Sequence, residues 1–210
     1  KENKIDFIIC DHHKPGIELP NAVAILNPKK SNCNYPFKDL CGCGIGFKLV
    51  QALSMQWDIN FDIVTDYLDL VAIATVSDLV PIVGENRILC YHGMKKLNET
   101  NKPGLKKFLS LSKSSINTSD ISFKIAPRIN SAGRIDHSLE AFKLLTYNEI
   151  IDVEKQFIKI EKFNENRRLI DEETTKEAIK IVENSKIKSN TTVVSSENWH
   201  KGVIGIVASR

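Results

Sequence analysis

The sequence predicts an α/β fold in which a small parallel sheet is followed by a mostly helical part. Two short, apolar, β-rich runs come first, at residues 5–10 and 22–26, and each gives way to polar or turn-forming residues. Longer segments with apolar residues at helical spacing follow. The chain has 210 residues, 42% of them hydrophobic, so it is long enough to bury a core and to span one domain and the start of another.

The first half predicts strand, strand and then helices. Ile5–Cys10 is expected to be a buried strand that ends in Asp11-His12-His13, and Ala22–Leu26 is expected to be a second strand. In open α/β sheets, ligands bind at the carboxyl ends of the strands. Helices are predicted next at residues 45–53, 62–76, 86–97 and 104–111. Asp78 therefore falls at the end of a helix.

The second half predicts more helix and then a new unit. A turn is expected near Ser119, a polar and basic loop at 127–134, and a helix at 138–145. Residues 149–184 are highly charged with apolar residues stepping by three and four, which predicts a long, exposed helix between two domains. A strand at 191–195 and a turn at 199–202 would open the next unit. The predicted domains are 1–148, a connector helix at 149–186, and the start of a second α/β domain at 187–210.

Charge and cysteine content set limits on the environment and partners. The formal net charge of +3 does not by itself require a polyanionic partner. No apolar run approaches the length of a membrane helix, and no signal-peptide pattern is present, so no membrane partner is expected. Five cysteines without a secretion signal predict reduced thiols and a cytoplasmic protein. The absence of an initiator Met and an apolar segment at Arg210 suggest that the chain is cut from a longer protein.

The strongest chemical signal is Asp11-His12-His13 after a strand. Imidazole and carboxylate groups are ligands for divalent metals, and one of these histidines could bind a metal while the other faces a phosphate. Asp78 would add a second acid, as a two-metal phosphoesterase requires. The alternative is a solvated polar strand end together with an ordinary acid in a helix-terminal turn. The spacing alone does not decide between them.

Three polar residues, Arg128, Asn130 and Arg134, share the segment 127–134 and could contact phosphate. Two arginines that cap neighbouring helices would give the same pattern, so both interpretations stay open. His200 beside Trp199 could stack on a base or simply pack. The remaining candidates are interpreted as structural, because the cysteines lack the paired spacing of zinc sites and the histidines fall on helices or helix starts: Cys33, Cys41, Cys43, His92 and His137.

Taken together, these segments resemble the RecJ family of the DHH phosphoesterase superfamily, whose members are single-strand-specific 5′→3′ DNA exonucleases. The resemblance extends over nearly the whole chain in the same order. It is carried by Ile8–His13, Leu26–Pro28, Leu40–Leu49, Val71–Pro81, Gly84–Arg87, Pro127–Arg134 and Trp199–Ala208.

The resemblance implies roles for the matched residues. His12 and Asp78 would be metal ligands, His13 the imidazole nearest the scissile phosphate, and Asp11 the acid that orients it. The nucleic-acid path would include Arg128, Asn130 and Arg134, and the domain begun at 187–210 would grip nucleic acid. We also expect His200 to contact nucleic acid.

The family further implies two divalent ions, most naturally manganese with magnesium as the other choice, and release of 5′-mononucleotides during DNA repair and recombination. Single-stranded DNA is the implied substrate, and a single-stranded-DNA-binding protein and a RecQ-type helicase are implied partners. Two aspartate motifs expected upstream of Lys1 and a Gly-Gly-His signature expected beyond Arg210 are not in this sequence, so the chain alone is expected to be inactive. Alternatives are a DHH phosphodiesterase that cleaves short oligonucleotides or cyclic dinucleotides, and a silent DHH-like protein that binds DNA or partners.

Overall fold

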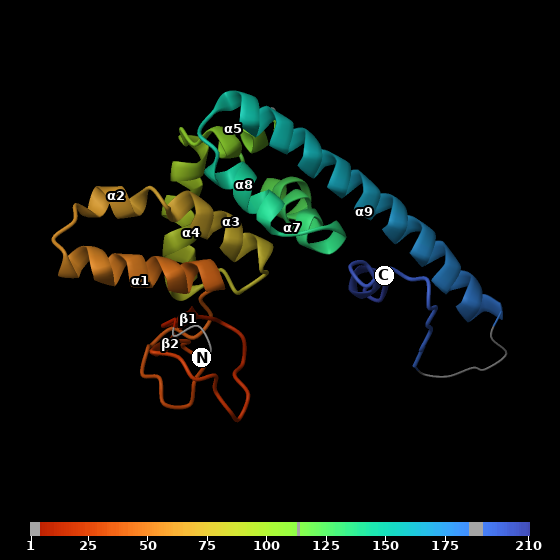
Figure 1. The fold of residues 1–210 in the computed structure, drawn as a ribbon, viewed down its shortest axis with the longest axis horizontal. Coiled ribbons are helices and arrows are strands. Elements are labelled where there is room, and N and C mark those ends of the chain that lie inside the picture. The colour runs from red at the N-terminus through yellow and green to blue at the C-terminus, as the bar shows by residue number, and fades with distance from the viewer. Residues whose placement is uncertain (1–4, 113, 185–190) are drawn as a thin grey trace. The chain divides into compact units, whose positions relative to one another are not determined.

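The computed structural model describes residues 5–112, 114–184 and 191–210 and confirms a mixed α/β fold with a small parallel sheet and many helices (Figure 1). The chain divides into two compact units, which are described separately: Lys1–Asn101 with Leu111–Phe123, and Lys102–Ser110 with Lys124–Arg210. The elements in chain order are β1 (Ile8–Cys10), β2 (Ala24–Leu26), α1 (Gly42–Gln56), α2 (Phe61–Thr65), α3 (Leu68–Ser77), α4 (Gly84–Asn98), α5 (Pro103–Leu109), α6 (Thr118–Asp120), a π-helix (Ile121–Ile125), α7 (Ala126–Ile135), α8 (Leu139–Thr146), α9 (Ile150–Asn184) and α10 (Ile204–Val207).

In the first unit, β1 and β2 pair in parallel with Ile9 opposite Ile25. The ladder continues beyond the strands, because the Asp11 N–H donates to the Leu26 carbonyl at 3.0 Å. The first strand was expected to be buried from residue 5, and that expectation is wrong: β1 begins at Ile8, which is 55% exposed. Its apolar pattern does not produce burial here because only β2 and α1 contact it closely among the described residues.

The helices of the first unit enclose an apolar core formed by Leu40, Ile45, Phe47, Val64, Leu68, Val71 and Leu89. One helix had been expected over 62–76, but the structure has two, α2 and α3. The Thr65 hydroxyl donates to the Asp62 carbonyl at 2.8 Å, a local bond that competes with continuation of the helix. Helices α3 and α4 lie very close at Gly93, where an added Cβ would be 2.2 Å from the Leu68 carbonyl oxygen.

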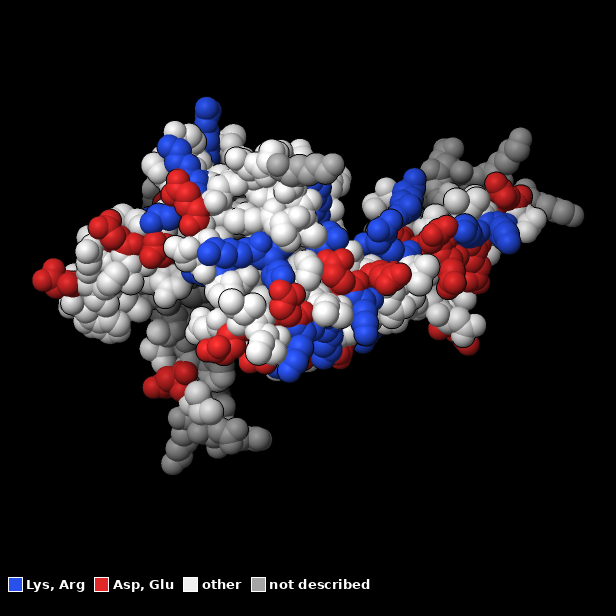
Figure 2. Space-filling view, turned by 90° about the horizontal axis from the view of Figure 1, so that it is seen from above, with Lys and Arg blue, Asp and Glu red and all other residues white. Residues whose placement is uncertain are grey.

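In the second unit, α9 packs against α5, α7, α8 and α10. Its buried residues, such as Val153 and Ile160, follow the predicted helical spacing. Figure 2 shows lysine, arginine and acidic residues interspersed along the outer face of this helix, as expected for a solvated surface. Residues 185–190, which complete the predicted connector and begin the predicted second domain, lie outside the described residues. Within the described ranges, no helix is both long enough and apolar enough to cross a membrane.

Two local predictions in the second unit are wrong. The expected loop at 127–134 lies within helix α7, because Pro127 sits in the first turn, where a missing N–H costs nothing, and Ala132 is buried. The expected strand at 191–195 is not a strand. Val193 is 92% exposed, and no strand among the described residues pairs with this segment, so its β-branched residues have nothing to pack against.

Candidate functional site

The structure brings together two predicted metal ligands that are far apart in the sequence. His12 follows β1, and Asp78 ends α3, as predicted. The His12 Nε2 and Asp78 Oδ2 atoms are 3.1 Å apart. Their side chains are 14% and 42% exposed, so the pair is partly shielded but can still be reached from solvent.

The spacing of this pair suits a shared cation. Two ligands at right angles around one ion, each about 2.1 Å from it, lie about 3.0 Å apart. The other imidazole nitrogen, His12 Nδ1, is buried and has no hydrogen-bond partner among the described residues. Metal-binding histidines usually use their second nitrogen to fix the ring, so this unpartnered atom is where such a contact would be made.

The pair alone is too small a donor set. Among residues 5–112, 114–184 and 191–210, no group of three His, Cys, Asp or Glu residues is arranged to hold a metal ion. Hard divalent ions such as magnesium prefer six ligands. His12 and Asp78 therefore fit as two ligands of an ion, and the described residues do not complete the site. Cys41 does not extend it, since its buried thiol accepts a hydrogen bond from the Gly44 N–H at the start of α1.

Asp11 and His13 form a second pair beside the first. The His13 Nδ1 lies 2.8 Å from Asp11 Oδ1, and the His13 backbone N–H donates to the same oxygen at 3.3 Å. Hydrogen bonding from the His13 side chain lowers the pKa of Asp11, so the carboxylate is ionised and can only accept. Nδ1 must then carry the proton, which leaves Nε2 of the 78% exposed His13 side chain for a ligand.

The backbone after α3 is strained. Asp78 has helical angles, but Leu79 has a φ of 55°, in the left-handed region that a branched side chain rarely adopts. Strain of this kind costs about 1–3 kcal/mol and persists only where neighbouring contacts enforce it. The turn that carries Asp78 is therefore held in place by other parts of the unit.

Asn86 makes such a contact, and Asn27 makes a comparable one in the turn that carries His13; no individual role for either is predicted from the sequence. Asn27 Nδ2 donates to the His13 carbonyl at 2.9 Å. Asn86 Nδ2 donates to the Pro81 carbonyl at 3.0 Å and to the Asp39 carbonyl at 2.7 Å. Both lie in segments that carry the family resemblance, and this was the signal that pointed to them. A neutral amide shows neither charge nor periodicity, so its contacts cannot be read from the sequence.

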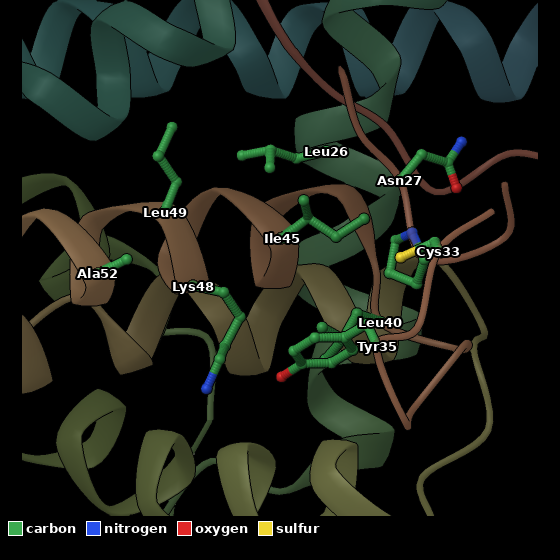
Figure 3. Close-up of a pocket in the computed structure, with 10 residues that line it drawn as sticks. Leu26, Asn27, Cys33, Tyr35, Leu40, Ile45, Lys48, Leu49 and Ala52 are labelled. Atoms are coloured by element: carbon green, nitrogen blue, oxygen red, sulfur yellow. The ribbon is translucent and has the colours of Figure 1, made fainter. Parts of the chain in front are cut away.

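A mainly apolar cavity of about 220 Å³ lies beside Asn27 in the first unit, between the end of β2 and α1 (Figure 3). Leu26 and Ile45 are among the side chains that line it. Its polar end is a network in which the Tyr35 hydroxyl donates to Glu85 at 2.8 Å and Lys48 Nζ lies 3.0 Å from Glu85 Oε1. Burial, reinforced by Glu85, raises the pKa of Tyr35, so this phenol stays protonated.

The predicted nucleic-acid residues all lie in the second unit. Arg128 is already engaged, because its guanidinium binds Glu161 of α9 and donates to the Lys124 carbonyl at 2.7 Å. Asn130 and Arg134 are four residues apart on α7, share one face and are exposed. Arg134 Nη1 donates to the Gly202 carbonyl at 2.8 Å.

Gly202 also connects His200 to this position. The Gly202 N–H donates to His200 Nδ1 at 3.1 Å. Arg134 and His200 are thus brought to the same short turn, whereas Arg128 is paired with Glu161. The two histidines interpreted as structural are exposed. The His92 ring lies edge-on to Tyr91, and His137 Nδ1 accepts from the Leu139 N–H.

Known proteins resemble this chain in both sequence and structure. Residues 1–75 match the model of the DHH family, N-terminal domain. The chain is 40% identical over 213 residues to the single-stranded-DNA-specific exonuclease RecJ of Bacillus subtilis (strain 168), covering 100% of this chain and 26% of that protein. It is 34% identical over 223 residues to the protein of the same description from Escherichia coli (strain K12), covering 98% of this chain and 39% of the relative.

Two solved structures have the same fold. The crystal structure of RecJ in complex with Mn²⁺ from Thermus thermophilus gives a TM-score of 0.86 at 26% identity, over 99% of this chain and 31% of that one. The crystal structure of an exonuclease RecJ bound to manganese gives a TM-score of 0.85 at 27% identity, over 99% of this chain and 52% of that one. The chain spans between 26% and 39% of the length of the two curated relatives described above.

Proposed function

The chain belongs to the RecJ family of DHH proteins, and from this premise we propose that the protein containing it is a single-strand-specific 5′→3′ DNA exonuclease that releases 5′-mononucleotides. The observation that carries the proposal is the 3.1 Å approach of His12 Nε2 to Asp78 Oδ2. Two side chains 66 positions apart in sequence meet at the spacing of neighbouring ligands on one ion. The relatives whose structures contain Mn²⁺ support manganese as the metal, with magnesium as the alternative.

In this proposal His12 and Asp78 each give one ligand to a site for two divalent ions, and further ligands come from outside the described residues. When bound, two such ions supply an activated water and neutralise charge on the phosphate. Asp11 holds the proton of His13 on Nδ1, and His13 Nε2 then faces the scissile phosphate. When Nε2 also carries a proton, the imidazolium donates a hydrogen bond to a phosphate oxygen and stabilises the negative charge that develops there.

The second unit would guide the strand. Asn130 and Arg134 on α7, with His200 beside them, would contact the sugar–phosphate backbone, because exposed guanidinium groups bind phosphate well. Arg128 would support them indirectly by joining α7 to α9. We further propose that α9 connects the nuclease domain to a second domain, that the protein works in the cytoplasm in DNA repair and recombination, and that a single-stranded-DNA-binding protein and a RecQ-type helicase are partners. The role in DNA repair and recombination and the two partners rest on the family resemblance alone.

The test uses the complete protein that contains this chain. Single strands of several lengths, labelled at the 5′ or the 3′ end, and a blunt duplex are incubated with Mn²⁺. The proposal requires early release of the 5′ label as a mononucleotide, continued degradation of long strands, and little cleavage of the duplex. Release of the 3′ label first, or cleavage restricted to short oligonucleotides, would reject it.

A substitution tests the role of His13 directly. His13→Ala should lower kcat by roughly 10²- to 10³-fold while single-strand binding stays close to wild type, because the ring stabilises charge on the phosphate without holding the strand. His92→Ala is the matched control, since His92 is an exposed histidine on α4 of the same unit. Unchanged turnover in His13→Ala would remove the assigned role.

A further inference from the structure

We propose that Asn27 and Asn86 are positioning residues that fix the two halves of the candidate site separately. Asn27 fixes the turn that carries His13, and Asn86 fixes the turn that follows Asp78. The inference rests on the proposed function, because it assigns His13 to the phosphate and Asp78 to the metal. It adds that neither turn depends on an ion for its conformation.

Asn27 joins the ends of the two strands. It is 4% exposed, its Nδ2 donates to the His13 carbonyl at 2.9 Å, and its Oδ1 accepts from the Lys29 N–H at 2.9 Å. In Figure 3 its amide points away from Leu26 and Ile45, so it does not serve the apolar cavity beside it. Both hydrogen bonds are to backbone groups, which makes Asn27 a clamp between the Asp11-His12-His13 turn and the residues after β2.

This clamp acts on His13 through the backbone. The His13 side chain is 78% exposed, so packing does not orient it. Its ring depends on Asp11 Oδ1 at 2.8 Å, and that bond requires the turn between the two residues to keep its shape. Removing the Asn27 donor leaves the His13 carbonyl free to rotate. The ring then samples other directions, which lowers the rate of a step that needs it in one place.

Asn86 performs the corresponding task after Asp78. It is fully buried and donates to the Pro81 and Asp39 carbonyls, so it ties the end of the strained turn to the segment that precedes α1. Its Oδ1 is buried without a partner among the described residues. A buried unsatisfied acceptor is costly, by about 1–3 kcal/mol. The hydrogen bonds of this side chain are therefore those of its donor, which holds the turn after Leu79.

The two amides therefore predict different defects. Loss of the Asn27 donor should disturb the phosphate-facing imidazole and leave metal affinity alone, because the ladder hydrogen bond from the Asp11 N–H to the Leu26 carbonyl holds the chain before His12 independently of Asn27. Loss of the Asn86 donor should let Asp78 move away from His12, which weakens metal binding. Removing a residue that orients a metal ligand typically costs roughly 10- to 100-fold in affinity. A residue that merely stabilises the fold would give neither pattern.

The experiment compares Asn27→Leu, Asn86→Leu and Asn98→Leu in the complete protein. Asn98 is the matched control, because its side chain also binds backbone groups, the Met94 and Ile116 carbonyls and the Ile116 N–H, and lies in the same unit away from the site. Each variant is measured for Mn²⁺ affinity by EPR titration without substrate, for kcat and KM on single-stranded DNA at saturating Mn²⁺, and for Tm.

We expect Asn27→Leu to lower kcat at least about tenfold with KM and Mn²⁺ affinity near wild type. We expect Asn86→Leu to weaken Mn²⁺ binding at least about tenfold and to recover most of its kcat when Mn²⁺ is raised. Asn98→Leu should lower Tm and change neither kcat nor Mn²⁺ affinity. If a leucine variant does not fold, the serine variant, which leaves room for a water, takes its place.

The inference would be overturned if Asn27→Leu and Asn86→Leu lost kcat and Mn²⁺ affinity equally, or if both variants lost only Tm. A wild-type protein that binds Mn²⁺ but does not degrade single strands would reject the proposed function instead. The EPR titration still decides the inference in that case. Asn86→Leu must weaken Mn²⁺ binding and Asn27→Leu must not, and any other result overturns it.

Discussion

Placing a methyl group between α3 and α4 should destabilise the first unit, although alanine is the better helix former. Gly93 lies in the middle of α4, where Ala would ordinarily gain about 1 kcal/mol from helix propensity. Here its Cβ would lie 2.2 Å from the Leu68 carbonyl oxygen and 2.7 Å from the Ala72 Cβ. The first neighbour is backbone and cannot rotate aside, so the two helices must part by about 1 Å.

The expected magnitude follows from these two opposing effects. Overpacking a close contact costs typically 1–3 kcal/mol, and a contact against backbone belongs at the upper end of about 3 kcal/mol. After the gain in helix propensity, Gly93→Ala should be less stable than wild type by about 2 kcal/mol. Gly46→Ala is the matched control, since Gly46 lies inside α1 and nothing is within 4 Å of its added Cβ. That variant should be more stable by about 1 kcal/mol.

Urea unfolding followed by circular dichroism measures both variants. With an m-value of about 2 kcal/mol per molar, the midpoint should fall by about 1 M for Gly93→Ala and rise by about 0.5 M for Gly46→Ala. Because α3 ends at Asp78, the displaced helix should also weaken Mn²⁺ binding by the complete protein. A Gly93→Ala midpoint equal to or above that of wild type would refute the close contact.

Three further predictions concern charge and metal. Hydrogen bonds from Lys143 and Lys159 lower the pKa of Glu140 to about 2. The stability that the ionised carboxylate adds is therefore present above its unfolded pKa of about 4.3 and is lost as pH falls toward 2. The difference in urea midpoint between wild type and Glu140→Gln should shrink over that pH range, and a constant difference would contradict this prediction. Arg134→Ala in the complete protein should weaken single-strand binding and reduce the slope of log affinity against log salt concentration by about one, whereas Arg128→Ala should mainly lower Tm. Fluorescence anisotropy at several salt concentrations measures binding by both variants, and a larger loss for Arg128→Ala would contradict the prediction. The 210-residue chain alone should bind Mn²⁺ weakly and hydrolyse little DNA, because its described residues offer two clustered ligands; isothermal titration and a nuclease assay on labelled strands check this, and robust cleavage by the chain would be the contrary result.

The parts of the site that the sequence predicts are those marked by chemistry at an element boundary. An acid and two imidazoles after a strand, and an acid after an apolar helix, stand out because charged residues interrupt an apolar pattern. Their approach to 3.1 Å could be expected only through the family resemblance, since no local pattern encodes a contact between His12 and Asp78. Asn27 and Asn86 had no signal of this kind, because their partners are backbone carbonyls.

The two wrong predictions in the second unit have one cause, because contacts with neighbouring elements decide the structure that local propensity leaves open. Residues 127–134 contain Pro, Asn, Ser and Gly, all typical of turns, yet Ser131 and Ala132 are fully buried in α7, a helix that packs on α9. These small residues let α7 approach α9 closely, and that packing stabilises α7 as a helix. Residues 191–195 show the opposite case. Their β-branched residues predict a strand, but no strand among the described residues pairs with this segment.

The hydrogen bonds indicate that the site keeps its geometry whether or not an ion is bound. If an ion were needed to draw His12 and Asp78 together, their turns would have few contacts of their own. Instead, the ladder hydrogen bond from the Asp11 N–H to the Leu26 carbonyl holds the residue before His12, and the buried amide of Asn86 ties the turn after Asp78 at the Pro81 carbonyl. Such a site loses little entropy when an ion binds, so its affinity depends mainly on how many ligands surround the ion. Further ligands would then strengthen binding without any rearrangement of the pair already present.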